Sequence, residues 1–358
     1  TDRRNRSCRT RLGRPSLGPR RAEIAIVPGE KADLVGIRAG GGADPGIAGA
    51  FRPQFGDCLA MGGAQESVAA GAAIGALDQI VRGENEWAGA WRQRLALTAA
   101  AITIKQAGRV EDEAALRDAV MLTRPGDDVG PAGRMLLAWR RLATRPSEDL
   151  LTERILDAVL EELGYAPGVE VVSDLADELR QLDGSAGTVE MLVGAFKAAD
   201  RYGFGRAVGS WLADALLAQR LGWAHAVPLL GTETVSALRP GRSRHSAAAV
   251  AATNIENEVD RAKALLAAQA RAALRAIDLS AELGRRAEKL LAVAPKLRAK
   301  GAKTVVDHLL SEDALVASRG DKTTGMSDRG RRRLFDRLVE LGAVRELSGR
   351  PTFRIYGL

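Results

Sequence analysis

Apolar residues recur at intervals of three and four along most of the chain after residue 64, which places them on one face of an α-helix. The clearest case begins at Ser147, a typical N-cap, with Glu148 and Asp149 at the positive end of the helix dipole. Gly164 is a typical residue for the end of such a helix. We therefore predict a helix over 148–164, with an apolar stripe made of Leu151, Ile155, Val159 and Leu163.

The same spacing predicts an irregular array of many helices. A further helical region runs from about 247 to Ala294, and its length indicates two helices with a break near Ser280 or Gly284. No fixed-period repeat of the tetratricopeptide or ankyrin type is present. The fold class is therefore mainly α, with predicted helices at 65–82, 87–107, 111–122, 131–144, 148–164, 171–183, 188–202, 206–222 and 224–237.

The pattern changes in the last part of the chain. A basic helix is predicted to begin at Ser327, as its N-cap, and to end at Gly342. Two short β-prone runs follow, AVREL and TFRIY, around the turn SGRP. A helix followed directly by a hairpin is the order of a winged helix-turn-helix, whose second helix enters a DNA major groove. Residues 299–358 are therefore expected to form a winged-helix-like module.

The charges of the basic helix favour DNA as its partner. Its apolar face predicts a buried stripe of Leu334, Leu338 and Leu341. The arginines then point outward in the first half of the helix, and two acids share that face in the second half. A recognition helix inserts its N-terminal half, so this polarity suits contacts to phosphates or guanine edges. The expected DNA contacts are Arg329, Arg332 and Arg333, with Arg350 in the hairpin turn.

A second interpretation of the same residues stays open. Runs of charge are often solvated faces, and the expected middle helix would lie in ALVASRGDKTTG, which has two glycines and weak periodicity. The module would then only pack or dimerise. The chain would be a helical protein-protein interaction or scaffolding protein without DNA binding.

Net charge supports basic character only at the two ends. The first 21 residues carry eight arginines and one acid, which equals the +7 of the whole chain. Residues 22–299 are acidic by net charge, so the body is not a polyanion-binding surface. We divide the chain into a basic, Gly- and Pro-rich, disordered tail and linker (1–63), an all-α body (64–298) and the module (299–358). Residues 1–21 are either such a disordered segment or not part of the natural protein.

Candidate chemistry elsewhere is sparse. Cys8 and Cys58 suggest no disulfide framework, no secretory segment is visible, and LALTAAAITI is too short for a bilayer, so we expect a cytoplasmic protein without membrane contact. The histidines stand alone, without ligands at metal-binding spacing. Neither a nucleotide loop nor a nucleophile motif can be placed. We therefore expect no metal, cofactor or catalytic residue, and no site at His225, His245 or His308.

Residues 108–143 hold the densest group of acids and arginines. Asp118, Asp127 and Asp128 could supply carboxylate chemistry, which is a third, enzymatic hypothesis. The structural interpretation is simpler, because Glu113 and Arg117 have the spacing of a helical ion pair. Trp87 and Trp91 are expected to be core packing rather than a ligand platform. These alternatives favour a protein that is not an enzyme.

Several segments resemble a known bacterial family, the one called domain of unknown function 1403. They are WAGAWRQRLALTAAA, EDEAALRDA, RPGDDVGPAGRMLLAWRRLA, LLAVAPKLRAKGA and RRLFDRLVELGAVRELSGRPTFRIYGL. The resemblance covers roughly Gly71 to the C-terminus and leaves 1–60 uncovered. It implies a bacterial cytoplasmic protein of the kind met in rhizobia and their relatives, often in mobile or plasmid-borne contexts. It brings no activity, cofactor or catalytic residue.

Overall fold

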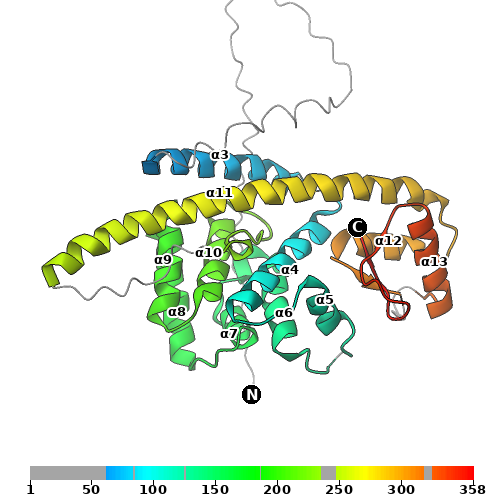
Figure 1. The fold of residues 1–358 in the computed structure, drawn as a ribbon, viewed down its shortest axis with the longest axis horizontal. Helices are drawn as coiled ribbons and strands as arrows, with labels where there is room; N and C mark the ends of the chain where they lie inside the picture. Colours follow the sequence, from blue (N-terminus) through cyan, green and yellow to red (C-terminus); the bar gives the residue numbers. More distant parts are fainter. Residues whose placement is uncertain (1–61, 84, 125, 186, 235–246, 318–324) are drawn as a thin grey trace, which may run out of the picture. The chain divides into compact units, whose positions relative to one another are not determined.

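The computed structural model describes residues 62–358 except 84, 125, 186, 235–246 and 318–324. Contacts group residues 52–358 into one compact unit, which is mainly α as predicted (Figure 1). The predictions for residues 1–61, including those for Cys8 and Cys58, lie outside the described residues. The α-helices are α3 Gly62–Arg82, α4 Ala88–Gln106, α5 Glu113–Met121, α6 Gly130–Thr144, α7 Glu153–Glu162, α8 Val169–Ser185, α9 Thr188–Arg201, α10 Arg206–Arg220, α11 Ala247–Val293, α12 Ala302–Ser311 and α13 Asp328–Glu340.

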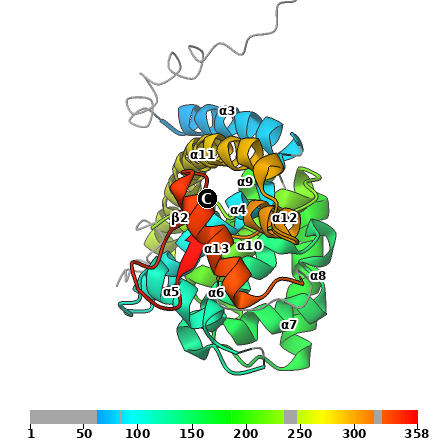
Figure 2. The same cartoon turned by 90° about the vertical axis from the view of Figure 1, so that its right-hand side faces the viewer.

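The long helix α11 organises the unit. It packs along α3 on one side and against α4 and α9 on the other (Figures 1 and 2). The predicted break near Ser280 or Gly284 is wrong, because α11 continues unbroken through both residues. A Cβ at Gly284 would lie 2.9 Å from the indole ring of Trp87, so this glycine allows Trp87 to approach the helix. The lack of a side chain at Gly284 therefore permits close packing and does not mark a turn.

Helix α4 lies in the middle of the core. It has buried side chains all round, which is why it lacks a clear polar face. Trp91 is fully buried and its indole N–H donates to the carbonyl of Ala276 on α11 at 2.9 Å, while Trp87 packs against the same core. Core packing of both tryptophans is therefore confirmed. The core continues without interruption into the C-terminal residues, where Phe335 and Tyr356 belong to it.

The segment predicted as one helix over 148–164 is two elements. A 3-10 turn, η1 (Ser147–Asp149), precedes α7, and Thr152 between them has extended backbone angles. Ser147 does not cap a helix, because its hydroxyl donates to the carbonyl of Trp223. The predicted stripe is nevertheless buried, at Leu151, Ile155, Val159 and Leu163.

The helix predicted over 224–237 is absent from residues 224–234, and 235–237 lie outside the described residues. An irregular segment and the 3-10 turn η2 (Leu230–Thr232) occupy this stretch. The carboxylate of Asp214 on α10 holds it by accepting three backbone N–H groups. These bonds measure 2.8 Å from Leu229, 2.9 Å from Leu230 and 3.3 Å from Gly231. A tertiary partner therefore replaces the intrahelical bonds that the sequence pattern suggested.

Burial decides the protonation of this carboxyl group. Asp214 is only 1% exposed, and the loss of hydration raises its pKa to about 7, although the three backbone N–H bonds act in the opposite direction. The folded protein therefore keeps a proton that the unfolded chain releases near pH 3.8. The resulting stability is fully present below pH 3.8 and is lost as pH rises to about 7.

This linkage predicts the pH dependence of an Asp214→Asn variant. An amide cannot lose a proton, so the fall in the free energy of unfolding between pH 4.5 and pH 7.5 should be shallower than in the wild type. Urea unfolding at several pH values measures it. Asp177→Asn, at an exposed acid paired with Arg180, should keep the wild-type profile. An unchanged profile in Asp214→Asn would contradict the assigned protonation.

Candidate nucleic-acid interface

The C-terminal residues form a small sheet with two flanking helices. The sequence of elements is α12, β1 (Leu315–Val316), α13, β2 (Arg345–Glu346) and β3 (Ile355–Gly357). The strands are antiparallel and lie in the order β1-β3-β2, so β3 is central. The predicted hairpin is therefore formed by β2 and β3. Within the stretch expected to hold a middle helix, residues 315–316 form a strand and 318–324 lie outside the described residues.

Helix α13 begins and ends as its sequence predicts. The hydroxyl oxygen of Ser327 accepts the backbone N–H of Gly330 at 3.2 Å, which caps the first turn. Gly342 follows the helix with a φ of +65°, the left-handed conformation that glycine adopts readily. Both predicted boundaries are confirmed.

The apolar face of α13 packs on the sheet. Leu334 and Leu338 are buried as predicted, and the ring of Phe335 stacks on Tyr356 with centroids 4.5 Å apart. The prediction that Leu341 belongs to the core is wrong, since its side chain is 38% exposed. Leu341 is the C-cap of α13, one position beyond its last helical residue.

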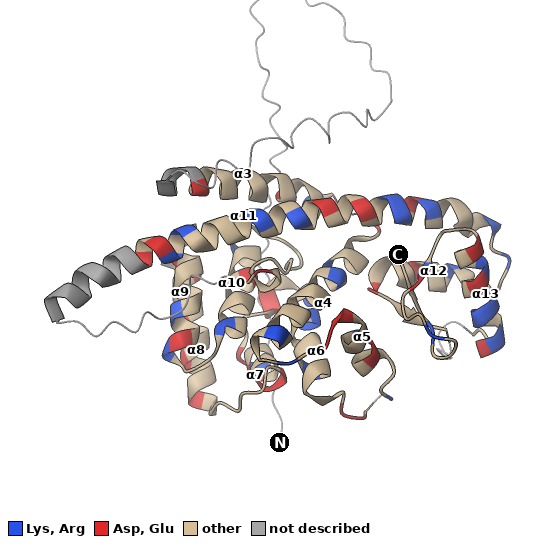
Figure 3. Ribbon diagram, viewed as in Figure 1, with Lys and Arg blue, Asp and Glu red and all other residues tan. Residues whose placement is uncertain are grey.

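The opposite face of α13 is basic in its first half. Arg329, Arg332 and Arg333 are exposed, and none of them forms an ion pair with another described residue. The acids of the second half do have partners: Asp336 lies 3.8 Å from Arg354, and Glu340 lies 3.0 Å from Arg337 on the helix itself. In Figure 2 α13 faces the viewer, and Figure 3 shows its cations and acids along the ribbon. This face therefore presents three cations that form no ion pair with a described residue, with one acid, Asp328, in the same first turn.

A shallow cavity of about 430 Å³ separates α13 from the loop of the hairpin. Phe353 lies at its edge with 62% of its surface exposed and a φ of +52°, a strained conformation for a residue with a side chain. No pattern in the sequence marks this position beyond an aromatic residue in a short run. The cavity is lined by Ala317, Arg332, Asp336, Pro351, Thr352, Phe353, Arg354 and Tyr356.

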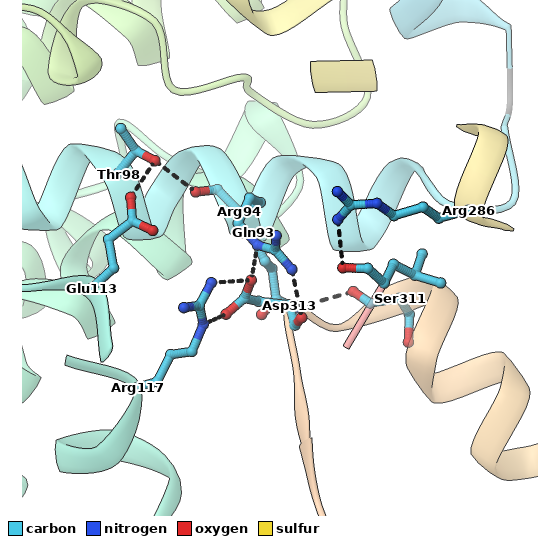
Figure 4. Close-up of polar contacts among 9 residues, drawn as sticks. Gln93, Arg94, Thr98, Glu113, Arg117, Arg286, Ser311 and Asp313 are labelled. Atoms are coloured by element: carbon cyan, nitrogen blue, oxygen red, sulfur yellow. Dashed lines mark hydrogen bonds and ion pairs between the residues drawn. The ribbon is translucent and has the colours of Figure 1, made fainter. Parts of the chain in front are cut away.

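A buried aspartate fixes the module on the body. Asp313, two residues before β1, has no exposed side-chain surface and is bound by Arg94 of α4 and Arg117 of α5 (Figure 4). Arg117 donates through Nε at 2.6 Å and through a terminal nitrogen at 3.2 Å. Gln93 adds a bond of 2.7 Å to the carboxylate of Glu312. Two helices of the body thus hold the chain in place just before the sheet begins.

Charge complementarity keeps Asp313 ionised. Burial alone would raise its pKa, but the charges and hydrogen bonds of Arg94 and Arg117 outweigh burial and lower it. The resulting stability is present above the ordinary pKa of 3.8 and is lost as pH falls below that value. At neutral pH the pair of arginines and the aspartate therefore form one buried ionic group.

The expected helical pair of Glu113 and Arg117 is not the arrangement observed. Arg117 bonds Asp313, 196 residues away in the sequence, whereas Glu113 accepts the hydroxyl of Thr98 at 2.9 Å (Figure 4). A partner so distant cannot be found from local spacing. Arg117 is therefore not part of a surface ion pair. It belongs to the contact between the helical body and the C-terminal module at Asp313, which we call the junction.

The hairpin turn is also tied to the body, through Arg350. Its two terminal nitrogens donate to the two carboxylate oxygens of Asp118 on α5, at 2.6 and 2.7 Å. Both groups are about one third exposed, so solvent reaches this ion pair. The residue expected to touch DNA from the turn therefore already has an anionic partner.

The acids of the enzymatic hypothesis have separate partners. Asp118 bonds Arg350, whereas Asp128 accepts the N–H of Gly130 and lies 3.5 Å from Arg134 at the start of α6. Asp127 is exposed in the same loop. Among the described residues no group of histidine, cysteine and acidic side chains could hold a metal ion. No described helix has the length and apolar character needed to cross a bilayer.

The junction predicts a large effect of Asp313→Asn. Loss of the carboxylate charge leaves Arg94 and Arg117 without their buried counterion, so the free energy of unfolding at pH 7 should fall by about 3 kcal/mol. Urea unfolding measures it, and the difference from wild type should shrink as pH falls below 3.8, because the unfolded chain then takes up a proton that the folded Asp313 does not. The control, Asp336→Asn at an exposed acid, should change stability by less than about 1 kcal/mol. Equal effects of the two variants would show that the junction is not a stabilising feature.

Comparison with known families places the chain. Residues 57–358 match the family described as "Protein of unknown function (DUF1403)", and this range includes the helical body and the whole C-terminal module. Comparison with curated proteins and with solved structures gives no match. Because the match spans most of the sequence, the chain belongs to the DUF1403 family of proteins of unknown function.

Proposed function

We propose that the C-terminal module binds double-stranded DNA through the first half of α13. The observation that carries this proposal is the exposed set of Arg329, Arg332 and Arg333, none of which is ion-paired with a described residue. Leaving three arginines on one short helix face unneutralised costs electrostatic repulsion, which a bound polyanion would relieve. A duplex has the required density of phosphate charge along its axis.

The order of elements supports a winged-helix arrangement. A helix, a strand, the basic helix and a two-stranded hairpin follow one another, and the last strand pairs with both others. In a helix-turn-helix protein the second helix of the motif lies in the major groove and uses its N-terminal residues on base edges. By this analogy α13 is the recognition helix, and the loop between β2 and β3 is the wing.

The charge order along α13 favours one direction of approach. Three exposed arginines and the positive end of the helix dipole lie in the first half beside one acid, Asp328, whereas two acids, Asp336 and Glu340, lie in the second half with one cation, Arg337. Phosphates would be attracted to the former and repelled by the latter. Arginine can bond guanine O6 and N7 together or hold a phosphate, so the same three side chains can give affinity and base selection.

Arg350 can contact DNA only after it separates from its present partner. To touch the DNA backbone from the wing, its guanidinium would have to leave the carboxylate of Asp118, which it bonds at both terminal nitrogens. Exchange of one anion for another is feasible at a pair that solvent reaches. In the absence of DNA, the pair orients the wing beside α13.

A second function is favoured by a different observation. Val339 and Leu341 are 40% and 38% exposed near the C-terminal end of α13, and such apolar side chains suit contact with another copy or with a protein partner. In this alternative the module serves self-association or scaffolding and has no DNA affinity. In the leading proposal the helical body takes that role, and DNA binding belongs to the module.

The leading proposal predicts the behaviour of R329A/R332A/R333A. In a chain limited to residues 52–358, which omits the arginines of 1–21, the triple variant should lose binding to random duplex DNA at low salt. What remains should depend little on salt, because each phosphate contact contributes roughly 0.9 to the slope of log affinity against log salt. Fluorescence anisotropy at 50 and 200 mM salt is a suitable measurement.

The matched control changes three exposed cations on other elements, K105A/R145A/R154A. It should bind as the wild type does. Equal affinity of all three proteins would reject α13 as the DNA-binding helix, and absence of binding by the wild type would favour the interaction-protein alternative.

The proposed role of Arg350 makes a prediction for Asp118→Asn. Removal of the carboxylate charge frees the guanidinium, so DNA affinity should increase by several-fold at low salt if Arg350 contacts phosphate. The double variant with Arg350→Ala should lose that increase. If Asp118→Asn binds DNA no more tightly than the wild type, Arg350 only orients the wing.

A further inference from the structure

A second basic surface lies between the end of α11 and the start of α12. From Lys289 to Val306 the chain contains no aspartate or glutamate. The 3-10 turn η4 (Ala294–Lys296) and the connecting residues carry three exposed cations in five positions. They are Lys296, Arg298 and Lys300.

These three side chains differ from most arginines of the body. Arg141 and Arg220, for example, are paired with acids of neighbouring helices. No ion pair within the described residues uses any of the three cations of this segment. Their charges are therefore available to a partner, as are those of the first half of α13.

The backbone that carries these cations is anchored at both ends. The N–H of Leu297 donates to the carbonyl of Ala294 at 3.1 Å, and the N–H of Ala302 donates to Ala299 at 3.0 Å. Leu297 also packs against the main core. A segment held in this way presents its charges with a smaller entropy cost of binding than a free tail would have.

The adjoining cavity does not suit a small anion. It measures about 760 Å³ and is mainly apolar, and Glu86 and Asp307 lie on its wall together with Lys303. A phosphate or carboxylate there would face two acids and mostly carbon. The three cations are spread along the chain instead of converging, which suits an extended polyanion better than a small ion.

The surface lies at the same end of the compact unit as α13. Figures 1 and 2 agree in placing the end of α11, the connecting segment and α12 beside α13, and Figure 3 shows Lys and Arg on the end of α11 and on α13. We propose that Lys296, Arg298 and Lys300 contact the phosphates of the DNA that α13 binds, which extends the footprint beyond the recognition helix. This inference rests on the proposed DNA-binding function.

Phosphate contacts of this kind carry no base information. They should raise affinity for all duplex sequences equally and set the position of the protein on the helix axis, whereas α13 would supply any preference for sequence. The proposal thus divides the work between two surfaces: general affinity at 296–300 and selection at α13.

The test is the salt dependence of DNA binding by the full chain carrying K296Q/R298Q/K300Q. The slope of log affinity against log salt should fall by roughly 2 to 3, since about 0.9 is lost with each phosphate contact. Affinity at 50 mM salt should fall at least tenfold for every duplex tried. The arginines of 1–21 are present in every protein compared, so their contribution cancels in the difference.

Two further proteins make the result specific. K105Q/R145Q/R154Q, with three exposed cations changed elsewhere, should keep the wild-type slope. K296R/K300R keeps the charges and should also bind normally. Thermal unfolding of each variant at the wild-type temperature excludes a loss of fold as the cause.

The outcomes separate this inference from the function on which it rests. If R329A/R332A/R333A loses binding while K296Q/R298Q/K300Q keeps the wild-type slope, α13 binds DNA and the second surface is rejected. If residues 52–358 of the wild type show no salt-sensitive DNA binding, both proposals fail. Binding to phosphatidylserine vesicles but not to DNA, lost in K296Q/R298Q/K300Q, would overturn the inference in favour of an anionic membrane surface.

Discussion

The burial of Asp313 between Arg94 and Arg117 is the constraint on which the C-terminal module depends. A carboxylate with no exposed surface loses its hydration, at a cost of several kcal/mol, and is tolerated only with charged partners in good geometry. Those partners stand on α4 and α5, so they hold the chain between these two helices, two residues before β1 begins. Because β1 pairs with β3, the same contact sets the sheet on which α13 packs.

The junction also explains why the total charge of the chain says little about its surface. Arg94 and Arg117 are ion-paired with Asp313 inside the fold, and Arg350 is ion-paired with Asp118. The cations that a nucleic acid could contact are those without such partners, namely the arginines early in α13 and the cations after α11. Both groups lack ion-paired acids among the described residues, and both belong to one compact unit with the junction between body and module.

Sequence alone predicts much of this fold and only part of the candidate site. The stripe at 151–163 and the cap at Ser327 follow from neighbours within one or two helical turns, and local physics determines them. The turn at Asp214 and the partner of Arg117 depend on residues 15 to 196 positions away, which no periodic pattern reports. Gly284 was wrongly predicted to mark a helix break for a related reason. The indole of Trp87, the residue before α4, packs against this position and explains why it is glycine.

The candidate site also has one part that local helical spacing predicts and one part that depends on distant residues. Helical spacing places Arg329, Arg332 and Arg333 on the outer face, but whether a cation is free is settled by the acids that folding brings near it. Arg350, in the turn between β2 and β3, was expected to contact DNA as well, yet α5 supplies it with Asp118. A basic residue therefore becomes a credible nucleic-acid contact through the absence of a nearby acid as much as through its own position. The first half of α13 and the segment before α12 meet that criterion, each with three such cations within five positions of the chain.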